Sequence, residues 1–96
     1  MSDKYDRDGK PLGLMEWAAK LEDNDYKRVA LTELPNGKRV STVWLGLDHR
    51  MGDAGPPLIF ETMVFDGESS SDLDMARYAT EAEALAGHDA MVEKHR

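Results

Sequence analysis

The spacing of hydrophobic residues predicts one helix near each end of the chain. Between positions 14 and 21 they recur at the i, i+3, i+4 and i+7 spacing of a single helix face, as Leu14, Trp17, Ala18 and Leu21. This helix of about ten residues should end near residues 23–25. A second helix is predicted from Thr80 to the chain end, because Thr80 and Glu83 have the spacing of a capping box. Its buried side would consist of Ala84, Leu85, His88, Met91 and Val92.

Two runs rich in β-branched residues flank the turn sequence Pro35, Asn36 and Gly37 and predict a hairpin. If these three residues form the loop, the facing pairs are Leu34 with Lys38, Glu33 with Arg39 and Val29 with Val43. Strand alternation then puts apolar side chains on both faces of the hairpin. One face would carry Val29, Leu31, Val43, Leu45 and Leu47, and the other Ala30, Thr32, Val40, Thr42 and Trp44.

The run from Pro57 to Phe65 is apolar on both alternating sets of positions, which predicts a central strand covered on each side. Residues 66–74 have loop composition, and residues 75–79 are predicted as a short strand. The predicted fold class is α+β: a three- to four-stranded antiparallel sheet, built from the hairpin plus the central strand and flanked by an N-terminal and a C-terminal helix. Residues 1–10 are predicted as a flexible N-terminal tail, which leaves residues 11–96 as a single domain.

The composition narrows the range of partners. The chain has 96 residues, 19 of them acidic and 12 basic, and a formal net charge of −7 at pH 7. This charge disfavours direct contact with nucleic-acid phosphates or a membrane and favours a basic protein as the partner. The chain lacks cysteine, so it forms no disulfide, thiolate nucleophile or cysteine-based metal site. With no signal peptide or membrane span in the sequence, we expect a cytoplasmic location.

Four residues supply the side-chain types of a hydrolytic metal site: Asp48, His49, Glu61 and His88. A small metal-dependent hydrolase or nucleotide-binding protein that uses Asp48, His49 and His88 is therefore kept as the alternative function. The favoured interpretation is structural, with Asp48 or His49 bonded to loop amides and Glu61 paired with an arginine or with backbone amides. His88 would be a partly buried side chain with one satisfied nitrogen. The sequence contains no nucleophile elbow, phosphate loop or dinucleotide fingerprint, so an enzyme is disfavoured and no cofactor is expected.

Acidic residues are dense between positions 66 and 83, where Arg77 is the single base. A solvated surface would account for them, but a dense acidic face also fits the basic groove of a nucleic-acid-binding protein. The predicted partner-binding residues of this acidic face are Asp66, Glu68, Asp72, Asp74 and Glu81. A homodimer through Trp44 and its neighbours is a third interpretation, because two short helices would cover only one of the two apolar sheet faces.

Three stretches of the chain, VSTVWLGLDH, GPPLIFETMVF and YATEAEALAGH, carry a resemblance to a known group. On these motifs the chain resembles small uncharacterised proteins encoded in bacteriophage and prophage genomes, over residues 14–92. The resemblance implies a phage-type product made in the bacterial cytoplasm, and it assigns no catalytic residue. Together with the charge, it predicts a small acidic accessory protein that acts by protein–protein contact and inhibits or modulates a host defence or nucleic-acid-binding factor.

Overall fold

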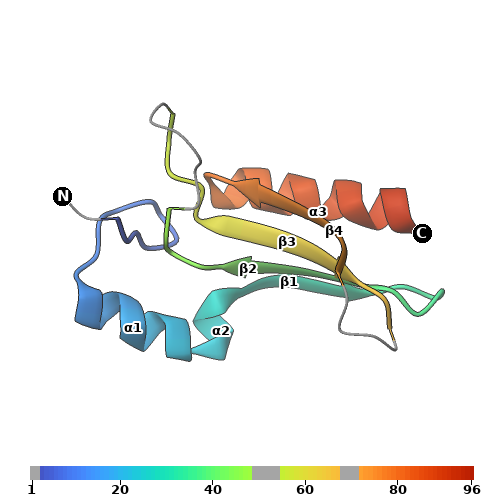
Figure 1. Cartoon of the computed structure of the whole chain (residues 1–96), viewed down its shortest axis with the longest axis horizontal. Coiled ribbons are helices and arrows are strands. Elements are labelled where there is room, and N and C mark those ends of the chain that lie inside the picture. Colours follow the sequence, from blue (N-terminus) through green and yellow to red (C-terminus); the bar gives the residue numbers. More distant parts are fainter. Residues whose placement is uncertain (1–2, 49–54, 68–71) are drawn as a thin grey trace.

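The computed structural model describes residues 3–48, 55–67 and 72–96. Its elements follow in the order α1 (Leu14–Glu22), α2 (Asn24–Lys27), β1 (Arg28–Glu33), β2 (Arg39–Trp44), β3 (Phe60–Phe65), β4 (Asp72–Tyr78) and α3 (Glu81–His95). The four strands form one antiparallel sheet in the order β1-β2-β3-β4. Helix α3 runs along this sheet, whereas α1 and α2 lie on the side of β1 (Figure 1). The predicted α+β fold class is confirmed, with four strands in the sheet.

The β1–β2 hairpin forms around the predicted turn. Gly37 has a φ of 90°, a conformation that favours glycine, and its amide donates a hydrogen bond to the carbonyl oxygen of Leu34 at 3.0 Å. The predicted pair of Glu33 with Arg39 is confirmed. Local turn chemistry therefore sets the register at this end of the sheet.

One predicted pair of the hairpin is wrong. Val43 lies opposite Arg28 instead of Val29, because the register shifts between Arg28 and Ala30. This bulge turns Val29 towards the hydrophobic cluster that contains Trp44. Arg28 takes the place of Val29 on the other face of the sheet, and a charge therefore replaces an apolar side chain there.

Helix α3 covers the face of the sheet that carries Val40, Thr42 and Trp44. The side chain of Trp44 is fully buried, and its indole N–H donates a hydrogen bond to the carbonyl oxygen of Tyr5 at 3.0 Å. The ring of Tyr26, from α2, packs edge-on against the indole with a centroid distance of 5.0 Å. The same chain thus covers Trp44, and the expectation that this residue meets a second copy is wrong.

Strand β3 has the central position that the sequence predicts, between β2 and β4. Helix α3 covers only one face of this strand. The residues on that face, Phe60, Thr62 and Val64, are buried. On the opposite face Met63 and Phe65 are only half-buried. Strand β4 begins at Asp72, three residues earlier than predicted. The pairing of β4 with β3 reaches Asp72 because the register shifts a second time, between Val64 and Phe65. The pattern of hydrophobic residues does not indicate such a shift.

The predicted capping box of α3 is confirmed. The Glu83 amide donates to the Thr80 hydroxyl at 3.1 Å, and the Thr80 amide donates to the Glu83 carboxylate at 3.2 Å. Three residues predicted on the buried side of this helix are buried: Ala84, His88 and Met91. Leu85 is 43% exposed, so its predicted burial is wrong. It lies about 100° around the helix from Ala84, outside the narrow stripe that contacts the sheet.

Candidate functional site

A buried polar cluster joins α3 to three strands. His88 is 3% exposed, with Nδ1 at 2.7 Å from Oγ1 of Thr42 on β2 and Nε2 at 2.9 Å from Oγ1 of Thr32 on β1. The Thr42 hydroxyl oxygen also lies 2.6 Å from that of Thr62 on β3. Both imidazole nitrogens therefore have a hydroxyl partner, one more than the sequence predicts.

The surroundings of His88 favour the neutral imidazole. Burial lowers the pKa of His88, because a charged ring loses the solvation that water provides. A neutral ring has one N–H donor and one acceptor nitrogen, and threonine hydroxyls can serve either of them. Since hydroxyls of the same chain occupy both nitrogens, this imidazole serves to hold the helix on the sheet.

The other members of the alternative hydrolytic site have different surroundings. His49 lies outside the described residues. Asp48 follows β2, and its Oδ1 accepts a hydrogen bond from the Leu58 amide at 3.1 Å, which closes the base of the loop between them as the sequence predicts. Over residues 3–48, 55–67 and 72–96, no group of three or more histidine, aspartate or glutamate side chains is arranged to hold a metal ion.

Glu61 pairs with an arginine, one of the two kinds of partner that the sequence leaves open. It lies opposite Arg77 in the β3–β4 pairing, and the Arg77 Nε donates to its Oε2 at 3.0 Å. Both side chains are partly shielded, with 14% of Glu61 and 33% of Arg77 exposed. The pair stabilises the sheet on the face opposite α3.

The tertiary structure divides the predicted acidic face. Asp74 lies on the α3 side of β4, where its Oδ2 is 2.7 Å from Nζ of Lys94 and 2.9 Å from Nε2 of His95. These hydrogen bonds hold the pKa of Asp74 well below its ordinary value. Glu81, at the other end of α3, accepts a hydrogen bond from Arg7 Nε at 2.8 Å. Two of the five predicted residues thus form ion pairs that hold α3 in place.

The remaining acidic residues of that set lie around the connection from β3 to β4. Asp66 and Asp72 are exposed there, and Glu68 lies outside the described residues. The structure therefore leaves two described carboxylates of the predicted face, Asp66 and Asp72, turned to solvent.

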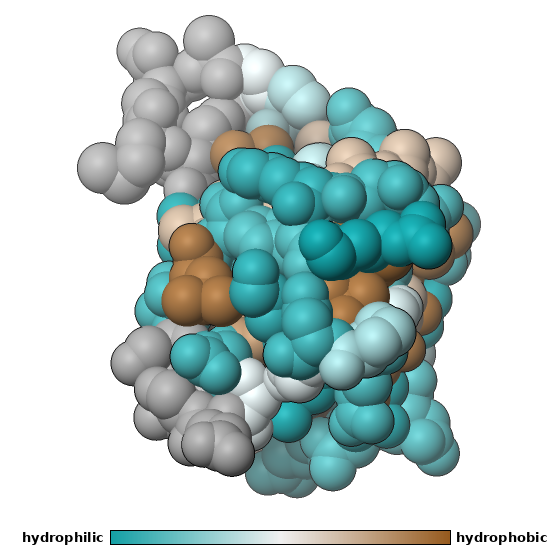
Figure 2. Space-filling model, turned by 90° about the vertical axis from the view of Figure 1, so that its right-hand side faces the viewer, coloured by the Kyte–Doolittle hydropathy of each residue, from teal (hydrophilic) through white to brown (hydrophobic). Residues whose placement is uncertain are grey.

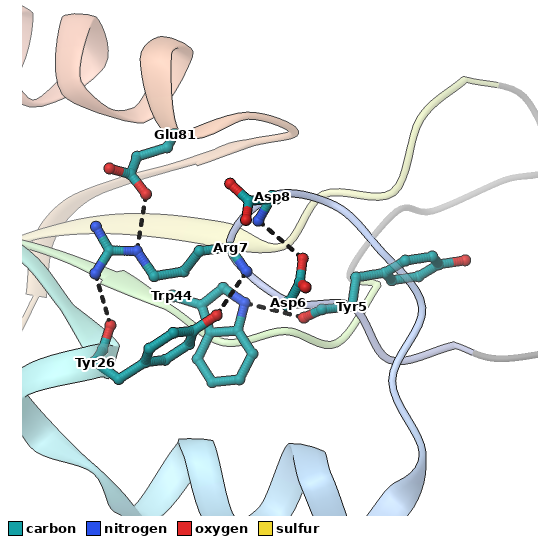
Figure 3. A network of polar contacts seen from close by, with 7 residues as sticks. All are labelled: Tyr5, Asp6, Arg7, Asp8, Tyr26, Trp44 and Glu81. Atoms are coloured by element: carbon teal, nitrogen blue, oxygen red, sulfur yellow. Dashed lines mark hydrogen bonds and ion pairs between the residues drawn. The ribbon is translucent and has the colours of Figure 1, made fainter.

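The N-terminal segment, which the sequence predicts as a flexible tail, packs against the body of the protein. Arg7 is its main anchor, since its guanidinium donates to Glu81 and to the carbonyl oxygen of Tyr26 at 2.8 and 2.9 Å. The Arg7 amide donates to the Tyr26 hydroxyl at 2.9 Å, and the Tyr5 carbonyl accepts from Trp44 (Figure 3). Because Glu81 is 74 positions away in sequence, no local pattern around Arg7 indicates this contact.

The sheet face opposite α3 is the open face, and strand pairing arranges its side chains in three rows across the four strands. The central row consists of Leu31, Ser41, Met63 and Met75. The two outer rows are Glu33, Arg39, Phe65 and Asp72, and Arg28, Val43, Glu61 and Arg77. Leu31 and Met75 are 44% and 41% exposed, and neither hydrophobic cluster of the described residues includes a side chain from these rows.

Charge is distributed unevenly between the open face and the remaining surface. The outer rows contain three carboxylates and three guanidinium groups, so the open face is formally neutral although the chain has a net charge of −7. Where the β1–β2 hairpin and the end of α3 come together, hydrophobic groups emerge between hydrophilic ones (Figure 2). The excess negative charge therefore belongs to the parts of the chain outside the open face.

A shallow hollow of about 220 Å³ lies between the β1–β2 hairpin and Gly67. Glycine is required at position 67, because a Cβ there would collide with the carbonyl oxygen of Gly37. The hollow is smaller than the roughly 300–1,000 Å³ typical of small-molecule sites. It is lined by Glu33, Leu34, Gly37, Lys38, Arg39 and Gly67.

The fold and these surfaces define a small α+β protein whose sheet has one helix-covered face and one open face. A scan against protein-family models finds no match, and searches of curated proteins and of solved structures find none either. Among the described residues, no helix has the length and apolar character needed to cross a membrane.

Proposed function

We propose that this protein acts by protein–protein contact, as a small acidic accessory protein that binds a basic partner. The distribution of charge carries the proposal: the open face is formally neutral, so the net charge of −7 lies on the rest of the surface. Such an exterior attracts a basic protein over a distance and orients it during encounter. The resemblance to phage proteins supports a host defence or nucleic-acid-binding factor as the partner that is inhibited or modulated.

The acidic residues around the β3–β4 connection are best suited to this contact. Asp66 is exposed, and Glu68 extends the acidic run in the sequence. Asp74 and Glu81 are less suitable, because each already pairs with a base of the same chain. Reversing either charge would place like charges together and disturb the packing of α3.

A double charge reversal tests the proposal. Asp66→Lys with Glu68→Lys should weaken partner binding by at least about tenfold, because attraction at the contact becomes repulsion. The matched control is Glu16→Lys with Glu22→Lys, which makes the same charge change on two exposed residues of α1. The partner is first captured from an extract of the bacterial host and identified by mass spectrometry, and its affinity for each variant is then measured by titration.

The control determines how the affinities are interpreted. Loss of binding in the first variant only, with an unchanged far-ultraviolet circular dichroism spectrum, supports a contact at residues 66 and 68. Full binding by that variant, or an equal loss in both variants, overturns this placement of the contact.

Competition with duplex DNA tests the class of partner. If the protein occupies a nucleic-acid-binding groove, added DNA should release it from the complex. A complex that survives saturating DNA contradicts a nucleic-acid-binding partner.

A further inference from the structure

We infer that the open face is a self-association surface and that its occupant is a second copy of this chain. This inference goes beyond the proposed function, because the basic partner is expected at the acidic exterior and not on the open face. Two copies would pack sheet against sheet, with the α3 helices on the outside. Each copy would then keep its acidic exterior accessible to a partner.

The central row of the open face supplies the apolar contact. Leu31, Met63 and Met75 follow one another across the sheet, with Ser41 between the first two. Both end residues of the row are more than two-fifths exposed. These three side chains form an apolar strip interrupted only by Ser41, and exposed apolar patches on small proteins often mark interaction surfaces. A two-fold axis along this row would place it against the same row of the second copy.

The outer rows complement each other in charge under the same axis. A two-fold rotation about the central row, perpendicular to the strands, places each outer row over the other outer row of the second copy. Glu33 then lies over Arg28 of the partner subunit. Asp72 likewise lies over Arg77 of the partner subunit. The two remaining charged residues face uncharged side chains. Arg39 lies over Val43 of the partner subunit, and Glu61 lies over Phe65 of the partner subunit. No like charges are therefore placed directly opposite each other.

The neutrality of the open face favours a second copy over a charged partner. Two chains with a net charge of −7 repel each other, but the surfaces that would meet here have no net charge of their own. A strongly basic or acidic protein would gain no net attraction from a neutral face. A second copy gains two complementary pairs, each of which occurs twice because the interface is symmetric.

The size of the open face sets the expected strength of the dimer. Four strands about 4.8 Å apart and six residues of about 3.4 Å each give a face of roughly 400 Å² in projection. This is below the roughly 800 Å² per partner of a standard interface. We therefore expect a weak, reversible dimer with a dissociation constant in the range of about 1–100 μM.

Sedimentation velocity over a wide concentration range tests the dimer. Wild-type protein should shift from the mass of one chain, 10.7 kDa, to twice that mass as its concentration rises. Met75→Asp should remain monomeric, because it buries a carboxylate in the central row. The matched control is Met15→Asp, which changes an 81% exposed methionine on α1 and should dimerise like the wild type.

A charge exchange tests the two-fold arrangement. Arg28→Glu should weaken the dimer at least about tenfold, because it faces Glu33 of the partner subunit. Adding Glu33→Arg should restore the affinity, because a glutamate at position 28 would then face an arginine at position 33 of the second copy. Within one chain these residues lie at opposite ends of β1, about 17 Å apart, so an effect on the fold of the monomer would not give this restoration.

The outcomes separate this inference from the proposed function. A wild-type chain that stays monomeric at high concentration overturns the dimer, and a dimer unaffected by Met75→Asp overturns its location. Failure of Glu33→Arg to restore association overturns the two-fold axis. If Met75→Asp still binds the basic partner, the proposed function stands by itself. Asp66→Lys alone should leave dimer formation intact, since Asp66 is in none of the three rows of the open face.

Discussion

His88 is a side chain for which the sequence allows either a structural role or a place in a metal site. Its position on the apolar side of the predicted helix allows burial or ligand binding, and Asp48 and His49 offered companions for a metal site. In the structure its two nitrogens contact Thr32 and Thr42, which belong to neighbouring strands. A buried imidazole needs such partners, because an unsatisfied polar group in the core costs about 1–3 kcal/mol.

The lowered pKa of His88 predicts that the folded protein loses stability at acidic pH. Burial lowers the pKa of His88 in the folded protein below the ordinary value of 6.5, so the unfolded chain binds more protons in the range just below pH 6.5. The free energy of unfolding should therefore fall as the pH drops below 6.5 and should be insensitive to this group above it. Urea unfolding between about pH 7.5 and 5 checks this, with His88→Gln as the non-titrating comparison. Identical pH dependence in the two proteins would contradict the prediction.

At the scale of the element, α3 is anchored at both ends. Its first turn is held by the Thr80 cap and by the ion pair between Arg7 and Glu81. Its last turn is held on β4 by Asp74, which contacts both Lys94 and His95. Basic side chains near a helix C-terminus also interact favourably with the helix dipole. Both ends of α3 are therefore tied to other segments of the chain.

The cap gives a measurable contribution to this anchoring. Thr80→Ala removes the hydroxyl that accepts from the Glu83 amide and should lower the free energy of unfolding by about 1 kcal/mol. Thr80→Ser keeps the hydroxyl and should leave the free energy of unfolding nearly unchanged, because serine is at least as good an N-cap as threonine. Chemical denaturation of the three proteins gives the comparison. Equal stability of the alanine and serine variants would show that the cap does not stabilise α3.

At the scale of the whole molecule, the arrangement of charge decides which surface can contact a basic partner and which can contact a second copy. The chain is strongly acidic, yet its open face is formally neutral, so the excess of carboxylates lies outside that face. A dimer of the inferred kind would present two acidic exteriors on opposite sides. Such a particle could contact two basic partner molecules at once and bind a repeated target with increased avidity.

Salt provides a test at the same scale. Raising the ionic strength from about 20 to 150 mM should strengthen the dimer severalfold, because the long-range repulsion between two acidic chains is screened first. Pairs in contact across the interface are screened much less. Sedimentation at both ionic strengths, with the Arg28→Glu, Glu33→Arg double variant as the comparison, checks the direction. A dimer that weakens with salt would mean that its charged pairs outweigh the overall repulsion.

Local chemistry explains which features could be predicted from the sequence. The turn at residues 35–37, the Thr80 cap and the central position of β3 depend on neighbouring residues or on a short hydrophobic run, and all three are confirmed. For Glu61 the sequence predicts that a shielded carboxylate needs a partner, either an arginine or backbone amides, and the structure shows that this partner is Arg77. These are features whose physical causes lie within a few residues of each other or follow from burial alone.

The sequence by itself determined the α+β class, the hairpin turn, the helix cap and the net charge, because each follows from short-range conformational preferences or from composition. Only the tertiary structure decided the bulge that turns Val29 towards the core, the burial of Trp44, the ion pairs of Asp74 and Glu81, and the three rows of the open face. Those features depend on contacts between distant segments. A shift of one residue in strand pairing is enough to exchange which side chains meet solvent and which meet the core.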